Sequence, residues 1–131
     1  MSSELTSNDL ASLYTIIARR RGPEGCPWDQ KQTPETIKKY LLEETEELAQ
    51  AMSGDDYQHI CEEIGDLFFI LTLITRIYED EGHFTLRDIF KGISKKMIRR
   101  HPHVFNGLKT GSESELKEQW ESIKADEKKS K

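Results

Sequence analysis

The 131-residue sequence has only two cysteines, Cys26 and Cys61, and no pattern relates them. Two such cysteines form neither a disulfide framework nor a zinc cluster, so we expect free thiols in a reducing compartment. The longest apolar run covers residues 67–74, whereas a membrane span needs about 20 residues. Residues 1–4 are polar and acidic, unlike a signal peptide. These absences predict a soluble, cytoplasmic protein without a membrane partner.

The sequence also has no surplus of basic residues. Nineteen Lys and Arg stand against 24 Asp and Glu, which gives a net charge of −5. A domain that binds nucleic acid is normally basic, so we expect no nucleic-acid partner. This balance still allows a local basic patch that faces a small phosphorylated ligand.

Helical periodicity dominates the chain, and no segment alternates like a strand, which predicts an all-α fold. The length suits a single domain over residues 1–131. We expect its core to span about residues 8–126 and residues 127–131 to form a frayed tail. A loop rich in glycine and proline covers residues 22–33. The expected helices cover residues 8–20, 34–52, 56–81, 86–100 and 113–126.

The expected helix 34–52 carries acidic residues on its apolar side. Projected at the helical angle, its apolar stripe consists of Ile37, Leu41, Leu48 and Ala51. Glu44 falls inside this stripe and Glu47 lies at its edge, whereas Glu43 and Glu46 point toward the polar side. A carboxylate on a buried face is costly unless it is paired or bound to a metal.

The expected helix 56–81 has two lines of side chains. The main apolar line consists of Tyr57, Ile60, Cys61, Ile64, Phe68, Leu71 and Tyr78. The second line consists of Glu63, Asp66, Ile70, Leu73 and Ile77. From residue 67 onward the helix is apolar almost all round, so we expect it to be buried on most sides. Glu63 and Asp66 therefore lie where a buried line begins.

Each of the two expected helices carries two acidic residues three positions apart: Glu44 with Glu47, and Glu63 with Asp66. This spacing puts both carboxylates of a pair on one helix face. If the two helices are antiparallel neighbours, the four carboxylates converge. Such a group needs cations, and oxygen ligands favour Mg²⁺ or Mn²⁺. No histidine lies among the four, which argues against a di-iron site. The alternative is ordinary surface charge on amphipathic helices.

The pattern Glu43-Glu44-x-x-Glu47 followed by Glu63-x-x-Asp66 resembles the MazG family of nucleoside triphosphate pyrophosphohydrolases. Three further segments resemble elements of the same family: GPEGCPWD at 22–29, RRHPHVF at 99–105 and WESIK at 120–124. The resemblance covers about residues 10–126. It implies a MazG-type helical bundle of four to five helices that assembles as a homodimer or homotetramer.

The resemblance also implies an activity, namely Mg²⁺-dependent cleavage of NTPs and dNTPs between the α- and β-phosphates. The products would be a nucleoside monophosphate and pyrophosphate, and the role would be house-cleaning of non-standard or excess nucleotides. The implied metal ligands are Glu44, Glu47, Glu63 and Asp66, with Mn²⁺ as a possible substitute for Mg²⁺. Glu43 is the candidate catalytic residue that orients the attacking water, or it makes only a surface pair with Lys39.

The same resemblance points to Lys95 and Arg99 as contacts for the triphosphate. Periodicity alone does not choose between this pair and Lys96 with Arg100. Trp120 with Lys124 offers an aromatic ring and a cation that could stack on a base, although tryptophan also serves as a core anchor. We expect Trp28 to be structural, with Asp29 fixing the loop. The candidate substrate-binding residues are therefore Lys95, Arg99, Trp120 and Lys124.

Two other functions stay open. A dUTPase-like enzyme or a phosphoribosyl-ATP pyrophosphohydrolase would use similar carboxylates on a narrower substrate, but the GCPWD and RRHPHVF segments favour the MazG branch. A non-catalytic nucleotide-binding or regulatory helical module is the second alternative. The four intact carboxylates argue against it. Some family members carry two tandem MazG domains, whereas the pattern occurs once in this sequence.

Overall fold

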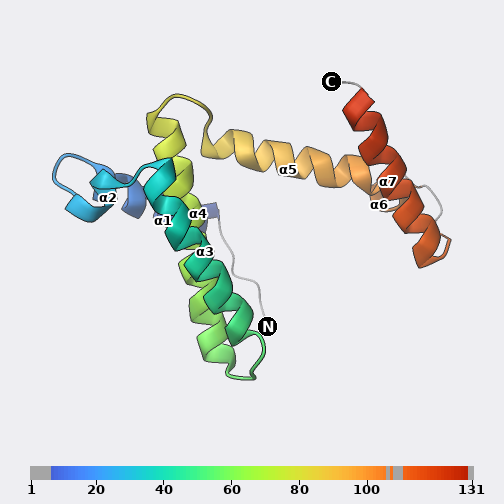
Figure 1. Ribbon diagram of the computed structural model, residues 1–131. Coiled ribbons are helices and arrows are strands. Elements are labelled where there is room, and N and C mark those ends of the chain that lie inside the picture. The colour runs from blue at the N-terminus through green and yellow to red at the C-terminus, as the bar shows by residue number, and fades with distance from the viewer. Residues whose placement is uncertain (1–6, 106, 108–110, 130–131) are drawn as a thin grey trace. The chain divides into compact units, whose positions relative to one another are not determined.

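The computed structural model describes residues 7–105, 107 and 111–129 (Figure 1). Every regular element in this part of the chain is an α-helix, which confirms the all-α prediction. The helices are α1 (Ser7–Arg21), α2 (Pro27–Lys31), α3 (Pro34–Ala51), α4 (Tyr57–Asp80), α5 (Leu86–Arg100), α6 (Pro102–Phe105) and α7 (Glu113–Lys129). No helix among them is long and apolar enough to cross a membrane.

The five long helices confirm the five predicted from periodicity, with ends that differ by a few residues. Two short helices were missed. Helix α2 lies inside the predicted loop, and α6 lies where the chain was expected only to stop. One helical turn carries too few residues to show a period, although both short helices begin with proline, which is favoured at the first helical position. Helix α7 extends to Lys129, so residues 127–129 of the expected tail are helical, and residues 130–131 lie outside the described part.

The chain divides into two compact units, Met1–Leu86 and Arg87–Lys131. The first unit contains α1 to α4. The second unit contains α5 from its second residue onward, together with α6 and α7. Our expectation of a single domain stays a prediction.

The core of the first unit lies among α1, α3 and α4. Helices α3 and α4 form an antiparallel pair joined by a short turn, and α1 packs against α4 (Figure 1). The buried side chains that fill the contact are Ile17, Ile37, Ile70, Leu73 and Ile77. Burial of such aliphatic side chains is the main favourable contribution to folding, so it sets the rotation of α3 and α4 about their axes.

The core takes the second side-chain line of α4, not the main apolar line. Leu73 is 0% exposed and Ile77 is 2% exposed, whereas Phe68 and Leu71 are 52% and 47% exposed. Within the described part of the first unit, the expectation that this helix is buried on most sides is therefore wrong. The physical reason is that α1 and α3 both pack against one side of α4, so the described residues of the first unit leave the opposite apolar line exposed.

Side-chain caps fix where α3 and α4 begin. At α3 the Thr33 side chain accepts from the backbone N–H of Thr36, and the Thr36 hydroxyl accepts from the backbone N–H of Thr33. At α4 the carboxylate of Asp56 accepts from the backbone N–H of His59 at 3.2 Å. These contacts satisfy amide groups that a helix start leaves unpaired. They fix the residue at which each helix begins.

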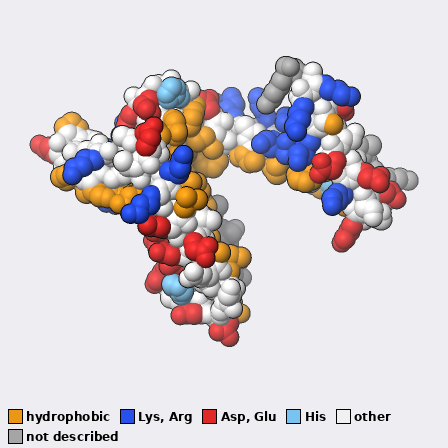
Figure 2. All heavy atoms as spheres, in the orientation of Figure 1, with side chains coloured by type: hydrophobic (Ala, Val, Ile, Leu, Met, Phe, Trp, Pro, Cys, Tyr) orange, Lys and Arg blue, Asp and Glu red, His pale blue; other side chains and the backbone are white. Residues whose placement is uncertain are grey.

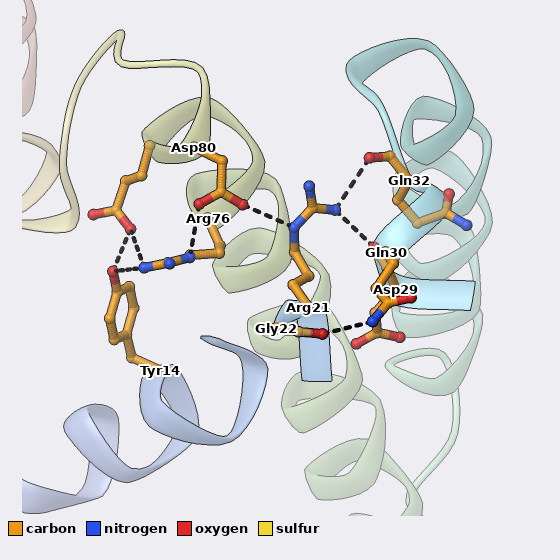
Figure 3. Close-up of polar contacts among 9 residues, drawn as sticks. Tyr14, Arg21, Gly22, Asp29, Gln30, Gln32, Arg76 and Asp80 are labelled. Atoms are coloured by element: carbon orange, nitrogen blue, oxygen red, sulfur yellow. Dashed lines mark hydrogen bonds and ion pairs between the residues drawn. The ribbon is translucent and has the colours of Figure 1, made fainter. Parts of the chain in front are cut away.

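Two arginines tie the end of α1 to α2 and α4. Arg20 forms an ion pair with the fully buried Asp29, with Nε 2.9 Å from Oδ2. Arg21 donates from Nη1 to the backbone carbonyls of Asp29 and Gln32 at 2.7 and 3.1 Å. Its Nε donates to Asp80 of α4 at 3.1 Å. Figure 3 shows Arg21 between Asp80 on one side and the α2 segment on the other. The arginines at the end of α1 therefore have a structural task.

The loop before α2 passes close to the end of α1. The backbone N–H of Cys26 donates to the carbonyl of Arg20 at 2.6 Å, and a side chain on Gly25 would collide with that same carbonyl. Glycine is therefore required at this position. Trp28 packs edge-on against Tyr40, with ring centroids 5.1 Å apart, and lies against the core. The structural roles expected for Trp28 and Asp29 are confirmed.

A second polar network joins α1 to the end of α4. Arg76 donates from Nη1 to the Tyr14 hydroxyl at 2.9 Å, and that hydroxyl donates to Glu79 (Figure 3). The other oxygen of Glu79 accepts from the backbone N–H of Leu86 at 2.8 Å. Burial, followed by the Glu79 contact, raises the pKa of Tyr14. Glu79 thus links α1, α4 and the first residue of α5.

Replacing Leu73 with alanine tests this core. Leu73→Ala is expected to lower the free energy of unfolding by about 2–5 kcal/mol, because it opens a cavity at a fully buried position. Leu42→Ala is the matched control, since Leu42 is 64% exposed, and it should change stability by about 0.5 kcal/mol or less. Urea titration followed by circular dichroism measures both. Equal losses in the two variants would contradict the assignment of the core.

Candidate functional site

The pairing of α3 with α4 brings three of the four predicted ligand carboxylates together. Glu44 of α3 and Glu63 and Asp66 of α4 each place one oxygen within 4.8 Å of the others. These three residues are called the carboxylate cluster below. The convergence arises because the core rotates the second line of α4, which begins with Glu63, toward α3. The acidic side chains lie along this pair of helices in the view of Figure 2.

Glu47 adjoins the cluster, although its side chain is exposed. Its negative charge is one of the causes that raise the pKa of Glu44 and of Glu63. All four predicted carboxylates therefore interact, with Glu47 at the rim.

Burial within the cluster is uneven. Glu63 is 9% exposed, Glu44 is half-buried and Asp66 is exposed. One oxygen of Glu44 and one of Glu63 are buried and have no hydrogen-bond partner among the described residues. A buried polar atom without a partner is unfavourable. Unpaired hard oxygens beside other carboxylates are the donor set that a divalent cation such as Mg²⁺ or Mn²⁺ suits.

The electrostatics of the cluster point the same way. Burial is the largest cause that raises the pKa of Glu44, followed by the charges of Glu47, Asp66 and Glu63. Burial also leads the causes that raise the pKa of Glu63, followed by the charges of Glu47 and Asp66. Like charges held close together favour the protonated form. A cation between them would reverse the effect, because it stabilises the ionised carboxylates.

His59 is a neighbour of the cluster that the sequence analysis missed. It lies one turn before Glu63 on α4, with Nδ1 3.9 Å from the nearer Glu63 oxygen, and its side chain is half exposed. It lines a hollow of about 520 Å³ at the turn between α3 and α4, together with Gln50, Asp55, Glu47 and Glu63. The spacing of four residues between His59 and Glu63 was the signal that could have identified it.

Glu43 lies outside the cluster, and its side chain is exposed. In the described part of the chain no ion pair joins it to Lys39, whose ammonium nitrogen lies 5.8 Å from the ring centre of Tyr40. The surface pair that we weighed for Glu43 is therefore not formed. Its role in orienting water stays a prediction.

The second unit holds the predicted basic and aromatic residues. Arg99 and Arg100 both pair with Glu127 of α7, so the two alternative basic pairs each contribute one arginine to a single contact. Lys95 is exposed and Lys96 is half-buried. Glu127 was not singled out from the sequence, because one carboxylate in a polar helix gives no signal.

Trp120 and Lys124 are in contact, as their spacing on one helix suggested. The Lys124 ammonium lies 4.6 Å from the ring centre of Trp120, and the guanidinium of Arg100 lies 5.8 Å from it. The ring is 37% exposed, which leaves part of it accessible. The stacking of Trp120 on a base stays a prediction.

The chain matches a known family and known relatives. The family model for the MazG nucleotide pyrophosphohydrolase domain matches residues 32–105. The uncharacterized protein YabN of Bacillus subtilis (strain 168) is 46% identical over 125 residues, which are 95% of this chain and 26% of that protein. The nucleoside triphosphate pyrophosphohydrolase of Escherichia coli (strain K12) is 43% identical over 122 residues, which are 92% of this chain and 46% of that protein.

A solved structure agrees with the fold. The crystal structure of a MazG-related protein from Thermotoga maritima matches with a TM-score of 0.75 and 29% sequence identity, over 88% of this chain and 98% of that chain. This confirms the predicted MazG-type fold. The chain spans about half or less of the length of the two curated relatives.

The raised pKa of Glu63 predicts how the stability of metal-free protein depends on pH. Because the folded-state pKa lies above the ordinary value of 4.5, the stability that protonation contributes is complete below that value. It is lost as the pH rises through the folded-state pKa. Glu63→Gln removes this loss. In EDTA we expect the variant to unfold at a higher temperature than the wild type at pH 7, and the difference to shrink toward pH 4.

Glu62→Gln is the control for that experiment, since Glu62 is adjacent but exposed. It should follow the wild type at both pH values in differential scanning calorimetry. Added Mg²⁺ should stabilise the wild type and Glu62→Gln more than Glu63→Gln, because a ligand that binds only the folded state raises its stability. A Glu63→Gln variant that is less stable than the wild type at pH 7 in EDTA would contradict the inference that the charge of Glu63 destabilises the metal-free protein.

Proposed function

The chain belongs to the MazG nucleotide pyrophosphohydrolase family, and from this premise we propose that it is a nucleoside triphosphate pyrophosphohydrolase. It cleaves NTPs and dNTPs between the α- and β-phosphates and releases a nucleoside monophosphate and pyrophosphate. The observation that carries the proposal is the carboxylate cluster, in which Glu44, Glu63 and Asp66 bring their oxygens within 4.8 Å of one another. House-cleaning of non-standard or excess nucleotides is the role that suits this chemistry.

The cluster and Glu47 are proposed to hold Mg²⁺, with Mn²⁺ as a substitute. Two features support this assignment: the buried oxygens of Glu44 and Glu63 without partners, and a donor set made only of carboxylates. When bound, the divalent cation neutralises the charge that builds up on the phosphate oxygens during cleavage.

The other predicted residues are assigned tasks within the same proposal. Glu43 accepts a hydrogen bond from the attacking water and orients it. Lys95 and Arg99 bind phosphate oxygens, because lysine and arginine donate charge-assisted hydrogen bonds to phosphate. Trp120 stacks on the base, with Lys124 beside its ring.

We also propose that the chain assembles as a homodimer or homotetramer. In the described part of the first unit the main apolar line of α4 stays largely exposed, with Tyr57, Ile64, Phe68 and Leu71 all more than 40% exposed. A continuous apolar patch of this kind marks an interaction surface. A second copy that covers it would supply the burial that we expected for this helix.

The activity is tested by product analysis on a panel of NTPs and dNTPs. With Mg²⁺ present, the wild type should release pyrophosphate and a monophosphate, and no orthophosphate. Glu44→Gln and Asp66→Asn should lose about 100-fold or more of the rate, since even indirect partners of a metal site contribute 10- to 100-fold. Chromatographic separation of the products measures both the rate and the bond that is broken.

Glu46→Gln and Glu62→Gln are matched controls, because both remove an exposed carboxylate next to a proposed ligand. They should keep wild-type rates. Folded protein that turns over no nucleotide in Mg²⁺ or Mn²⁺ would refute the hydrolase proposal. If it still bound nucleotide, the non-catalytic module would take its place.

The assembly is tested by light scattering coupled to size-exclusion chromatography. We expect the mass of two or four chains of 15.2 kDa. Phe68→Asp should shift the mass toward a single chain, because a charge cannot be buried without a partner. Ile16→Asp on α1, where Ile16 is 55% exposed, should leave the mass unchanged. A single-chain mass for the wild type at every concentration would contradict the proposal.

A further inference from the structure

In the second unit, two consecutive arginines of α5 share one carboxylate of α7. Arg100 donates from Nη2 and Nε to one oxygen of Glu127, at 2.9 and 3.3 Å. Arg99 donates from Nε to the other oxygen. Both oxygens of Glu127 are therefore occupied by guanidinium groups, and its side chain is only 18% exposed.

The surroundings of this contact carry further positive charge and an aromatic ring. Lys124 and Arg100 lie over the ring of Trp120. The name arginine cluster is used below for Arg99, Arg100, Lys124, Trp120 and Glu127. Figure 2 shows Lys and Arg side chains gathered over part of this unit. The five residues of the cluster include three cations and one carboxylate, of which Arg99 and Arg100 contact Glu127 and Lys124 contacts the Trp120 ring.

This geometry is that of an anion site filled by the chain itself. Guanidinium groups recognise carboxylate and phosphate with the same paired N–H donors. A single carboxylate held by two arginines therefore stands where a phosphate group would be bound. The cluster adds a partly exposed ring beside those donors, and the phosphates and base of a nucleotide need both features.

We propose that Glu127 is a built-in competitor, whose carboxylate occupies the arginine pair that binds the phosphates of the nucleotide. The inference rests on the proposed function for the class of ligand, a nucleoside triphosphate. It assigns Arg100 as a second phosphate contact beside Arg99. Phosphate binding then requires Glu127 to release both arginines.

The contact is suited to exchange. It is made by long side chains that reach between α5 and α7, and the Arg99 side chain is 50% exposed. Ion pairs with an exposed partner contribute little to stability, so a ligand with several negative charges can displace Glu127 from Arg99. Arg100 is only 16% exposed and holds Glu127 more firmly. The hydrogen bonds from Arg100 and Arg99 lower the pKa of Glu127 to about 2. Glu127 is therefore ionised, and competes, throughout the physiological pH range.

The test measures the binding of inorganic tripolyphosphate by isothermal titration calorimetry in EDTA, so that the carboxylate cluster and catalysis take no part. Glu127→Gln should bind about fivefold more tightly than the wild type, the factor expected when the two ion pairs of Glu127 no longer have to break. Arg100→Gln should bind more weakly than the wild type. Glu118→Gln removes an exposed carboxylate from the same helix, and it should bind like the wild type.

Glu127→Ala serves as a second variant and should also bind more tightly. Equal or weaker binding by both Glu127 variants would overturn the proposal, because Glu127 would then hold the arginines in position and not compete. An equal gain in affinity for Glu118→Gln and Glu127→Gln would also overturn the proposal, since the gain would then come from net charge alone. Circular dichroism confirms that each variant is folded.

Product analysis separates this inference from the proposed function. If the wild type cleaves nucleotides and the Glu127 variants bind tripolyphosphate no more tightly, the competitor proposal is refuted and the hydrolase proposal is supported. If Glu127→Gln gains affinity for tripolyphosphate but no nucleotide is cleaved, the competitor proposal is supported and the hydrolase proposal is refuted.

Discussion

The mutual repulsion of the carboxylates between α3 and α4 is the constraint on which the site depends. Apolar burial at Leu73 and Ile77 holds the two helices together, and the same rotation of α4 turns Glu63 into the interface. The attraction of the core and the repulsion of the cluster therefore act on the same pair of helices. Without a cation the charge is accommodated by raised pKa values at Glu44 and Glu63. The fold thus presents a carboxylate cluster whose charges repel one another when no cation is near.

The rest of the first unit supports this pair of helices. Arg21 connects α1 to the α2 segment and to Asp80. Tyr14 with Arg76 and Glu79 forms a second connection at the same end of α4, where Arg76 also pairs with Asp80 (Figure 3). These contacts use charged groups at helix ends and leave the middle of α4 to apolar packing. The acidic chemistry and the structural ion pairs are consequently kept in different parts of the same helices.

Much of the architecture could be predicted from the sequence. The five long helices follow from apolar periodicity, and the capping threonine before Pro34 marks the start of α3. The carboxylates were recognisable because Glu44 interrupts an apolar stripe. The two short helices were missed because a single turn has no period. The exposure of Phe68 and Leu71 was also missed, because periodicity shows that a face is apolar and not which partner covers it.

The sequence by itself determined the element order, the acidic residues and their helical spacing, since these depend on interactions between residues three or four positions apart. Only the tertiary structure decided which line of α4 faces α3, because that choice depends on packing between segments distant in the chain. It brought Arg99 and Arg100 onto Glu127 across 27 residues or more of sequence, a contact between long side chains that no local pattern encodes.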